Sequence, residues 1–518
     1  MKKVIKLSVF IIGIISIWCG LNYILERAKD PKWDNSGLSY VYNNPDYYDV
    51  IFTGTSITIT NISCEELYLS YGIAGVTIGE PTQPTYLSYY SLEEALKYQH
   101  PKAVMFDVSS LFYTEDELIG NLQYDQHHHL HYTLDSMKNN RTKYEAFCQA
   151  KELVPDIDIW SYFSKTYYNH SNWENLGIGN FDRTSDKLVM NGNLMLFSVQ
   201  QNKDNIDNDN TGDLAEIPEI NLKYLYKMID LCNEKNVPLI LTRGSGNYTW
   251  AKYNAIKKLA QKYNILYIDL NDNKKEAGIN LTEDCVDGTH FNPLGAQKWT
   301  HVIGNYLKSH FSISDRRLDN KYNRYQEQEE FYNDALKAMD DMLTLASGTT
   351  FNEYLSYLKD LDMKDTSVFI SVVEDASANL TDNEVWCLNE MGLNADLLGK
   401  YGYSYIGIFG EAGIQEELGA ELLEINGKIG DTISYKVISG GYFTNNNASI
   451  EIDGKEEMAG GKGINIVVYN SKIENVISSV YFDTTQFVNP PTCMINQINQ
   501  EQYEAELGLW LPLENYES

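Results

Sequence analysis

Between residues 40 and 310, short apolar runs alternate with segments in which apolar residues recur at helical spacing. The runs predict strands at 48–52, 103–108, 238–241 and 265–270, and the helical segments predict helices at 64–71, 91–98, 222–235 and 251–263. The run at 103–108 is almost wholly apolar, which is typical of a parallel strand buried on both faces. The alternation predicts a doubly wound α/β domain at 40–312, with its site at the carboxyl ends of the strands.

Ser91 followed by Glu94 is similar to a capping box, and it predicts that the second helix begins at residue 91. Residues 120–215 do not keep the alternation, so a helical insertion is expected there, with a polar loop at 204–213.

The pattern changes twice after residue 312. Residues 313–362 are charged and helical, and they predict a solvated connector or a small helical layer. Residues 363–486 predict a mostly β domain with one helix at 383–391, because short β-rich runs are separated by Gly and Asn turns. These runs lie at 367–373, 403–409, 432–439, 449–452, 464–469 and 476–482. The tail at 487–518 is polar and has no assigned role.

The first 25 residues predict a membrane anchor. Residues 4–25 are apolar apart from Lys6 and Asn22, which is long enough to span a bilayer. Lys2 and Lys3 favour a cytoplasmic N-terminus and place the rest of the chain outside. A cleaved signal peptide is the alternative, although no A-x-A-like site follows the run, and Trp18 before Cys19 is too large for lipoprotein cleavage.

The amino-acid composition limits the classes of binding partner and cofactor that the chain can have. The formal net charge of -31 excludes nucleic acid as a partner, because phosphates require basic surface. The 39 tyrosines are compatible with sugar stacking or with ordinary packing. The seven cysteines include no C-x-x-C spacing, which argues against a zinc site, and no cofactor is expected. A disulfide between Cys387 and Cys493 stays open.

Two short motifs suggest acyl chemistry. In "DCVDGTHFNPLGAQKW", Asp287 and His290 are three residues apart, so the carboxylate can orient the imidazole as a base. The alternative is a surface loop in which Asp287 and His290 form a hydrogen bond with each other and have no catalytic role. The Asn-Pro pair that follows predicts a helix N-cap with Pro at the first position. Ser56 ends the first strand in "DVIFTGTSITITN", and a serine needs such a base to act as a nucleophile.

The order Ser56, Asp287, His290 resembles the SGNH/GDSL esterase superfamily, in which Gly-Asp-Ser commonly stands where this chain has Gly-Thr-Ser. The resemblance covers about residues 48–310. It implies an oxyanion hole formed by the N–H groups of Ser56 and Gly79, with Asn247 as a weak third donor. The usual Gly-x-Asn-Asp block is absent, and "FDVSSLFY" stands in its place. This departure fits the membrane-anchored branch that serves teichoic-acid D-alanyl transfer and polysaccharide O-acetylation, beside a membrane-bound O-acyltransferase.

The run of histidines at 127–129 and 131 suggests a metal site, with Asp125 nearby. Adjacent histidines point in different directions, however, so a polar or cleft-lining segment is the preferred interpretation and no metal is expected.

Residues 365–485 resemble the interleukin-like EMT inducer (ILEI/PANDER) domain. The segments "FISV", "YSYI", "GKGIN" and "FD" carry the match in order. The resemblance implies a compact β-rich fold and a glycan-binding role. Aromatic residues near turns support that role modestly, and core packing explains each of them equally well: Tyr401, Tyr403, Tyr405, Tyr442 and Phe443.

The sequence therefore predicts a membrane-anchored, extracytoplasmic serine esterase or acyltransferase that acts on acyl esters, chiefly acetyl, of a cell-envelope polysaccharide. The alternative is a non-catalytic glycan-binding or scaffold protein of a polysaccharide acylation system. A glycosidase ranks lower, because no carboxylate pair has recognisable spacing.

Overall fold

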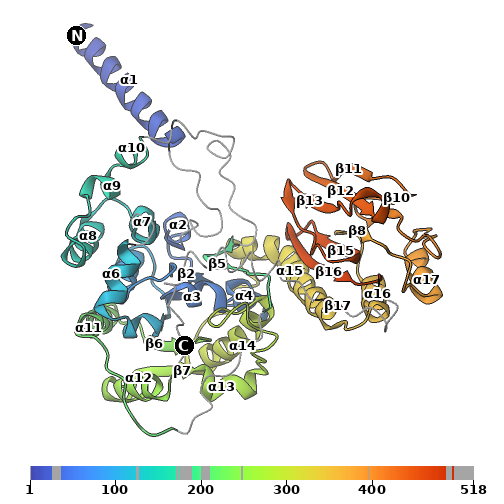
Figure 1. Cartoon of the computed structure of the whole chain (residues 1–518). Coiled ribbons are helices and arrows are strands. Elements are labelled where there is room, and N and C mark those ends of the chain that lie inside the picture. Colours follow the sequence, from blue (N-terminus) through green and yellow to red (C-terminus); the bar gives the residue numbers. More distant parts are fainter. Residues whose placement is uncertain are drawn as a thin grey trace. The chain divides into compact units, whose positions relative to one another are not determined.

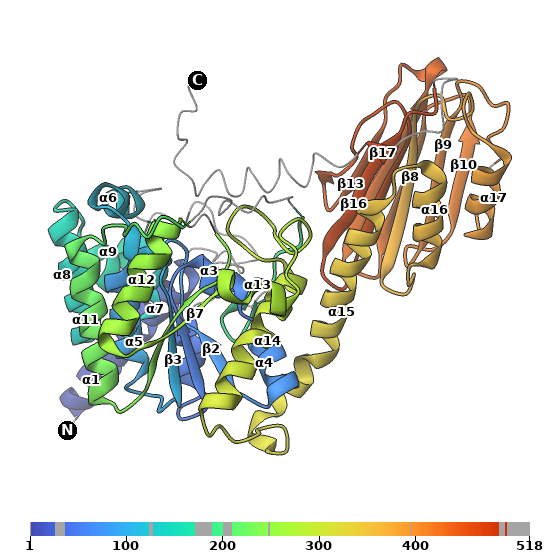
Figure 2. The same cartoon turned by 90° about the horizontal axis from the view of Figure 1, so that it is seen from below.

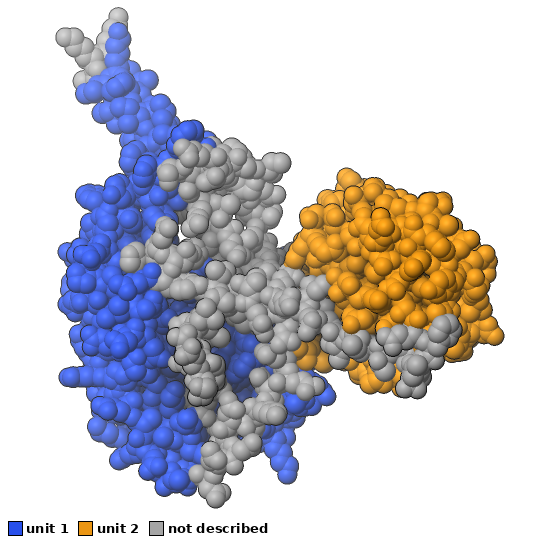
Figure 3. All heavy atoms as spheres, viewed as in Figure 1, with its two compact units in different colours: residues 1–196, 201–329 blue, residues 197–200, 330–518 orange. Residues whose placement is uncertain are grey.

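The chain forms two compact units, which are coloured separately in Figure 3: residues 1–196 with 201–329, and residues 197–200 with 330–518. The computed structural model describes residues 2–25, 37–123, 128–170, 173, 189–199, 210–246, 249–394, 396–485 and 493–494. The first unit contains a parallel five-stranded sheet and the second a separate mixed sheet. The predicted α/β part and β-rich part are therefore confirmed.

The sheet of the first unit has the strand order β2-β1-β3-β6-β7, and all neighbouring strands are parallel. Its strands are β1 (Val50–Thr53), β2 (Gly75–Thr77), β3 (Ala103–Asp107), β6 (Leu239–Arg243) and β7 (Leu266–Asp269). The strand order reverses at β1. The carboxyl end of β1 is therefore the switch point at which such sheets bind ligands.

Helices cover both faces of this sheet (Figure 2). Ile51 and Phe106 point to one face and pack against α5, α11 and α12, whereas Phe52 and Met105 point to the other and pack against α4 and α14. These helices are α4 (Cys64–Tyr71), α5 (Thr85–Ala95), α11 (Glu219–Glu234), α12 (Trp250–Tyr263) and α14 (Pro293–His310). The continuous apolar runs of the sequence follow from this burial on both faces.

Helix α5 begins at Thr85, so the predicted start at residue 91 is wrong. Tyr86, Leu87 and Tyr90 are buried and extend the apolar face of the helix toward its N-terminus. Ser91 therefore lies inside α5, where its hydroxyl is buried and makes no hydrogen bond within the described residues. The local capping pattern was overridden by tertiary packing.

The insertion contains a β-hairpin that the sequence did not predict. Its strands are β4 (Val189–Met190) and β5 (Asn193–Leu194), joined by Asn191 and Gly192 at positive φ. Asn193 accepts a hydrogen bond from the Cys64 N–H at 2.8 Å and donates to the Thr77 hydroxyl at 3.0 Å. The hairpin therefore links the C-terminal end of β2 to the N-terminal end of α4 through hydrogen bonds. The insertion's helices are α6 (Glu115–Gln123), α7 (His128–Ser136), α8 (Arg141–Leu153), α9 (Ile159–Phe163) and α10 (Lys165–Tyr168). Most of the predicted polar loop lies outside the described residues.

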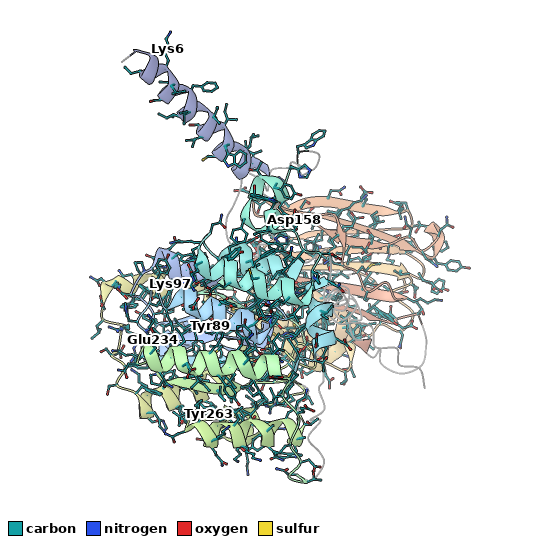
Figure 4. The ribbon with its side chains drawn as sticks, turned by 90° about the vertical axis from the view of Figure 1, so that its left-hand side faces the viewer. Lys6, Tyr89, Lys97, Asp158, Glu234 and Tyr263 are labelled. Atoms are coloured by element: carbon teal, nitrogen blue, oxygen red, sulfur yellow. The ribbon has the colours of Figure 1, made fainter. Side chains whose placement is uncertain are left out.

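The N-terminal segment forms helix α1 (Lys2–Leu25). Its apolar side chains, such as Phe10 and Ile17, are exposed, and Figure 4 shows side chains around the helix with Lys6 near its end. No helix of the described residues combines the length and apolar content needed to cross a membrane, so the predicted anchor at 1–25 is not found among them.

Among the described residues, the other short helices of the first unit are α2 (Gly37–Asn43), α3 (Ser56–Asn61), η1 (Ser109–Phe112), α13 (Leu270–Ala277) and η5 (Asn320–Tyr322). The long helix α15 (Asn323–Ser347) begins in the first unit, where Tyr325 stacks on Tyr68 and donates to the Gly75 carbonyl at 2.9 Å. The helix ends in the second unit (Figure 1). The predicted helical connector thus consists partly of residues that belong to the first core.

The second unit is built on β8 (Thr366–Glu374), which pairs with three neighbours. The other strands are β9 (Ser404–Gly410), β10 (Gln415–Gly419), β11 (Leu423–Ile429), β12 (Ile433–Gly441), β13 (Ser449–Ile452), β14 (Lys455–Glu456), β15 (Gly463–Asn470), β16 (Asn475–Phe482) and β17 (Cys493–Met494). Its helices are α16 (Phe351–Asp360), α17 (Asp382–Glu390) and η6 (Tyr442–Thr444). Cys387 is a free thiol among the described residues, so the structure gives no support to the disulfide with Cys493 that the sequence left open.

Candidate active site

The turn between β1 and α3 presents Ser56 at the carboxyl end of the sheet. Ser56 is the first residue of α3, and Thr55 caps the helix by accepting a hydrogen bond from the Ile57 N–H at 3.3 Å. Gly54 has a φ of 151°, and a side chain there would collide with the Thr58 hydroxyl and lie 2.7 Å from Cβ of Asp107. The turn therefore requires glycine at position 54.

Ser56, His290 and Asp287 form a continuous hydrogen-bonded chain. Ser56 Oγ lies 2.8 Å from His290 Nε2, and Asp287 Oδ2 lies 2.7 Å from His290 Nδ1. A carboxylate only accepts, so Nδ1 carries the proton and the Nε2 lone pair faces the serine hydroxyl. His290 and Asp287 are buried, whereas Ser56 is partly exposed. This is the arrangement that a base-activated serine nucleophile requires.

The loop around Asp287 holds the carboxylate in place. Asp287 Oδ1 accepts from the N–H groups of Thr289 and His290 at 2.5 and 2.7 Å and from the Thr289 hydroxyl at 2.9 Å. The Thr289 hydroxyl also lies 3.1 Å from His290 Nδ1, but the closer carboxylate is the stronger acceptor. Asn292 caps α14 through the Gly295 N–H, with Pro293 as the first helical residue, so that prediction is confirmed.

Asn61 and Ser245 join this loop to α3, and sequence reasoning missed both. Asn61 Oδ1 accepts from the Phe291 N–H at 2.9 Å, and Asn61 Nδ2 donates to Ser245 Oγ at 2.8 Å. Ser245 Oγ in turn donates to the Thr289 carbonyl at 2.5 Å. The two side chains therefore fix the spacing between the serine turn and the histidine loop.

Replacement of Asn61 by alanine is expected to slow the reaction of Ser56 with an acyl ester by about 10- to 100-fold and to lower stability by roughly 1–3 kcal/mol. The change leaves the buried Phe291 N–H without its acceptor and frees the histidine loop. Turnover and urea denaturation measure the two effects, with Asn233→Ala on the exposed side of α11 as the control. Wild-type turnover in a folded Asn61→Ala chain contradicts this role.

The oxyanion donors predicted by the resemblance are placed only in part. The Ser56 N–H is the first of α3 and makes no hydrogen bond within the described residues, whereas the Ile57 and Thr58 N–H groups bind Thr55. Gly79 lies against the same turn, where a side chain would approach the carbonyl oxygens of Gly54 and Thr55 to 3.0 Å. Asn247 lies outside the described residues.

The histidine run does not assemble as a unit. His127 lies outside the described residues, as does Asp125. His129 Nδ1 lies 3.0 Å from the Thr82 hydroxyl, whereas His131 binds Asp135 at 3.0 Å and stacks on Tyr162 and Tyr168. No three potential ligands come together as a metal site in the part of the chain that the structure describes.

Comparison with known proteins gives no family. Neither a protein-family model nor a curated protein matches this chain. The case for a function therefore depends on the geometry of the site.

Proposed function

We propose that the chain is an SGNH/GDSL-type serine ester hydrolase or O-acyltransferase that acts on acyl esters, chiefly acetyl, of a cell-envelope polysaccharide. The observation that supports it most is the hydrogen-bonded chain from Ser56 through His290 to Asp287 at the carboxyl end of β1. The resemblance to the SGNH/GDSL superfamily suggests the ester, and the resemblance to its membrane-anchored branch suggests the polysaccharide.

The reaction would proceed in two halves. Ser56 Oγ attacks the acyl carbonyl while His290 Nε2 takes the hydroxyl proton, and the carbonyl oxygen becomes an oxyanion beside the Ser56 N–H. The sugar oxygen then leaves with the proton from His290, and the acyl group stays on Ser56 as an ester. Water or a second sugar hydroxyl attacks that ester, again with His290 as base, to give the free acid or the transferred ester.

Acetate release from O-acetylated polysaccharide tests hydrolysis directly, and mass spectrometry of a non-acetylated polysaccharide incubated with an acetyl ester donor tests transfer. Either activity supports the proposal. If the purified full chain turns over none of these substrates and reacts with no small acyl ester, the proposal is contradicted.

The proposed location is the outer face of a cell membrane, beside a membrane-bound O-acyltransferase that supplies the acyl group. Lys2 and Lys3 before the apolar run support the orientation, and the exposed apolar side chains of α1 support attachment. Recovery of the full chain in the soluble fraction of gently broken cells contradicts this location.

A second candidate function, glycan binding by the second unit, is favoured by an exposed aromatic cluster. Tyr401, Tyr442 and Phe443 are 57%, 58% and 60% exposed, and their neighbouring rings lie 5.9–6.4 Å apart. Exposed aromatic faces stack on sugar rings. Tyr405, in contrast, is buried and donates to Glu416, so it is a core residue.

The Tyr442→Ala, Phe443→Ala double variant is expected to bind O-acetylated polysaccharide about tenfold more weakly, because two stacking faces are lost. Affinity electrophoresis of the full chain measures the change. Trp386→Ala is the matched control, since Trp386 is 53% exposed on α17 of the same unit. Equal retention of the double variant and the control argues against this glycan surface.

A further inference from the structure

Asp107 is a buried carboxylate beside the serine turn to which sequence reasoning gave no role. It is the last residue of β3, and only 2% of it is exposed. A side chain at Gly54 would lie 2.7 Å from Cβ of Asp107 and 3.3 Å from its backbone nitrogen. Strand β3 therefore packs directly behind the turn that carries Ser56.

Hydrogen bonds connect Asp107 to the cap of α3. The Thr55 hydroxyl has one proton, which it donates to Asp107 Oδ1 across 3.5 Å, and its oxygen accepts from the Ile57 N–H. The Ser109 N–H donates to the same carboxylate oxygen at 3.1 Å. Asp107 thus orients the hydroxyl that occupies the Ile57 N–H and leaves the neighbouring Ser56 N–H for an oxyanion.

We propose that Asp107 is a positioning residue for Ser56, whose ionised carboxylate holds the Thr55 hydroxyl and, through it, the turn that presents the Ser56 hydroxyl and N–H. The inference rests on the proposed function, because it assigns Asp107 a part in serving the same nucleophile. It also gives a role to the residue that stands where the usual Gly-x-Asn-Asp block is missing.

The surroundings of Asp107 set the pH range of this effect. Burial raises the pKa of the Asp107 carboxyl to about 6, against the hydrogen bonds from Ser109 and Thr55 and the charge of Arg243. Arg243 on β6 is itself bound to Asp269 by two hydrogen bonds of 2.9 and 3.0 Å. Burial and the charge of Asp107 raise the pKa of Tyr113, so that group stays neutral.

Protonation of Asp107 is expected to weaken its hydrogen bond with the Thr55 hydroxyl. Above its pKa of about 6, Asp107 is a carboxylate, and a charged acceptor holds the Thr55 hydroxyl more strongly than a neutral one. Below that pKa the acceptor is neutral and the hold weakens. An asparagine at 107 is a neutral acceptor of the same size at every pH. The Asp107→Asn chain should therefore behave at every pH as the wild type does when Asp107 is protonated.

The test is the rate of covalent labelling of the full chain by a fluorophosphonate across this pH range. Asp107→Asn is expected to label about fivefold more slowly than the wild type near pH 8, and the two rates should converge near pH 5. His290 is present in both chains and affects both labelling rates equally. The ratio of the wild-type rate to the Asp107→Asn rate therefore reports the effect of Asp107 alone. Asp116→Asn, on the exposed first turn of α6, is the control and should label at the wild-type rate throughout.

A second pair of variants tests the path through Thr55. Thr55→Val removes the hydroxyl and with it the contacts to both Asp107 and the Ile57 N–H, so adding Asp107→Asn to Thr55→Val should slow labelling no further. Thermal melting at each pH shows that every variant is folded. A rate ratio that does not change with pH, or effects of the two substitutions that add, overturns the inference while labelling of Ser56 itself still supports the proposed function. If the wild type is not labelled, both proposals fail.

Discussion

Replacement of Ser56 by alanine is expected to lower acyl-ester turnover by about 10⁴-fold or more. The hydroxyl that lies 2.8 Å from His290 Nε2 is the only atom in the arrangement proposed to form the acyl-enzyme bond. Removing it leaves the oxyanion donors and the fold in place, so any remaining rate reflects binding and general base catalysis of water. Initial rates of acetate release from O-acetylated polysaccharide measure the effect.

The matched control is Ser309→Ala in the last turn of α14, where the hydroxyl is exposed and donates to the Tyr306 carbonyl. That variant should keep the wild-type rate. Turnover by Ser56→Ala within tenfold of the wild type would show that another group is the nucleophile.

Asp287→Asn is expected to lower turnover by about 10⁴-fold, although the side chain keeps its size. Asp287 Oδ2 accepts from His290 Nδ1 at 2.7 Å, which keeps the lone pair on Nε2 facing Ser56. An amide at 287 can donate its own N–H to Nδ1, which moves the ring proton to Nε2 and blocks base catalysis. Steady-state kinetics with the same polysaccharide should show the loss in kcat.

Asp230→Asn on the exposed side of α11 is the control for this charge change. The Asp287→Asn chain should also stay folded, because the amide oxygen can still accept from the Thr289 and His290 N–H groups that bind Oδ1. A folded variant that keeps its kcat within tenfold of the wild type contradicts the proposed orientation of the imidazole.

Much of the fold followed from the sequence because burial on two faces leaves a continuous apolar run. The apolar run at 103–108 predicted β3 to within one residue, and helix α4 was predicted with its observed ends. Strand β2 has only three residues and hairpin β4–β5 has two per strand, so neither leaves a periodic pattern. In the second unit, β10 and β11 were missed, since both strands are only partly buried and rich in polar residues.

The candidate site likewise contains residues that the sequence predicted and residues that it did not. Ser56, Asp287 and His290 were predicted because their order and spacing resemble a known arrangement, and the structure brings them together. Asn61 and Ser245 carry no such signal, since both act through tertiary contacts: Asn61 binds Ser245 and Phe291 across 184 and 230 residues of sequence, and Ser245 binds Thr289 across 44.

Asp107 did leave a signal that could have been used. A charged residue directly after a buried parallel strand lies at the edge of the sheet where sites form. Its neighbour across the turn is Thr55, in the position where the resembling superfamily commonly has Asp. The acidic group that contacts this turn comes from β3, so the pattern at positions 54–56 alone does not reveal it.

Mass spectrometry of the full chain after incubation with a fluorophosphonate tests the central claim most directly. We expect one covalent adduct, located on the peptide that contains Ser56, and a labelling rate that falls sharply in His290→Ala because the serine loses its base. An unlabelled chain, or an adduct on any other residue, would contradict the assignment of Ser56 as the nucleophile.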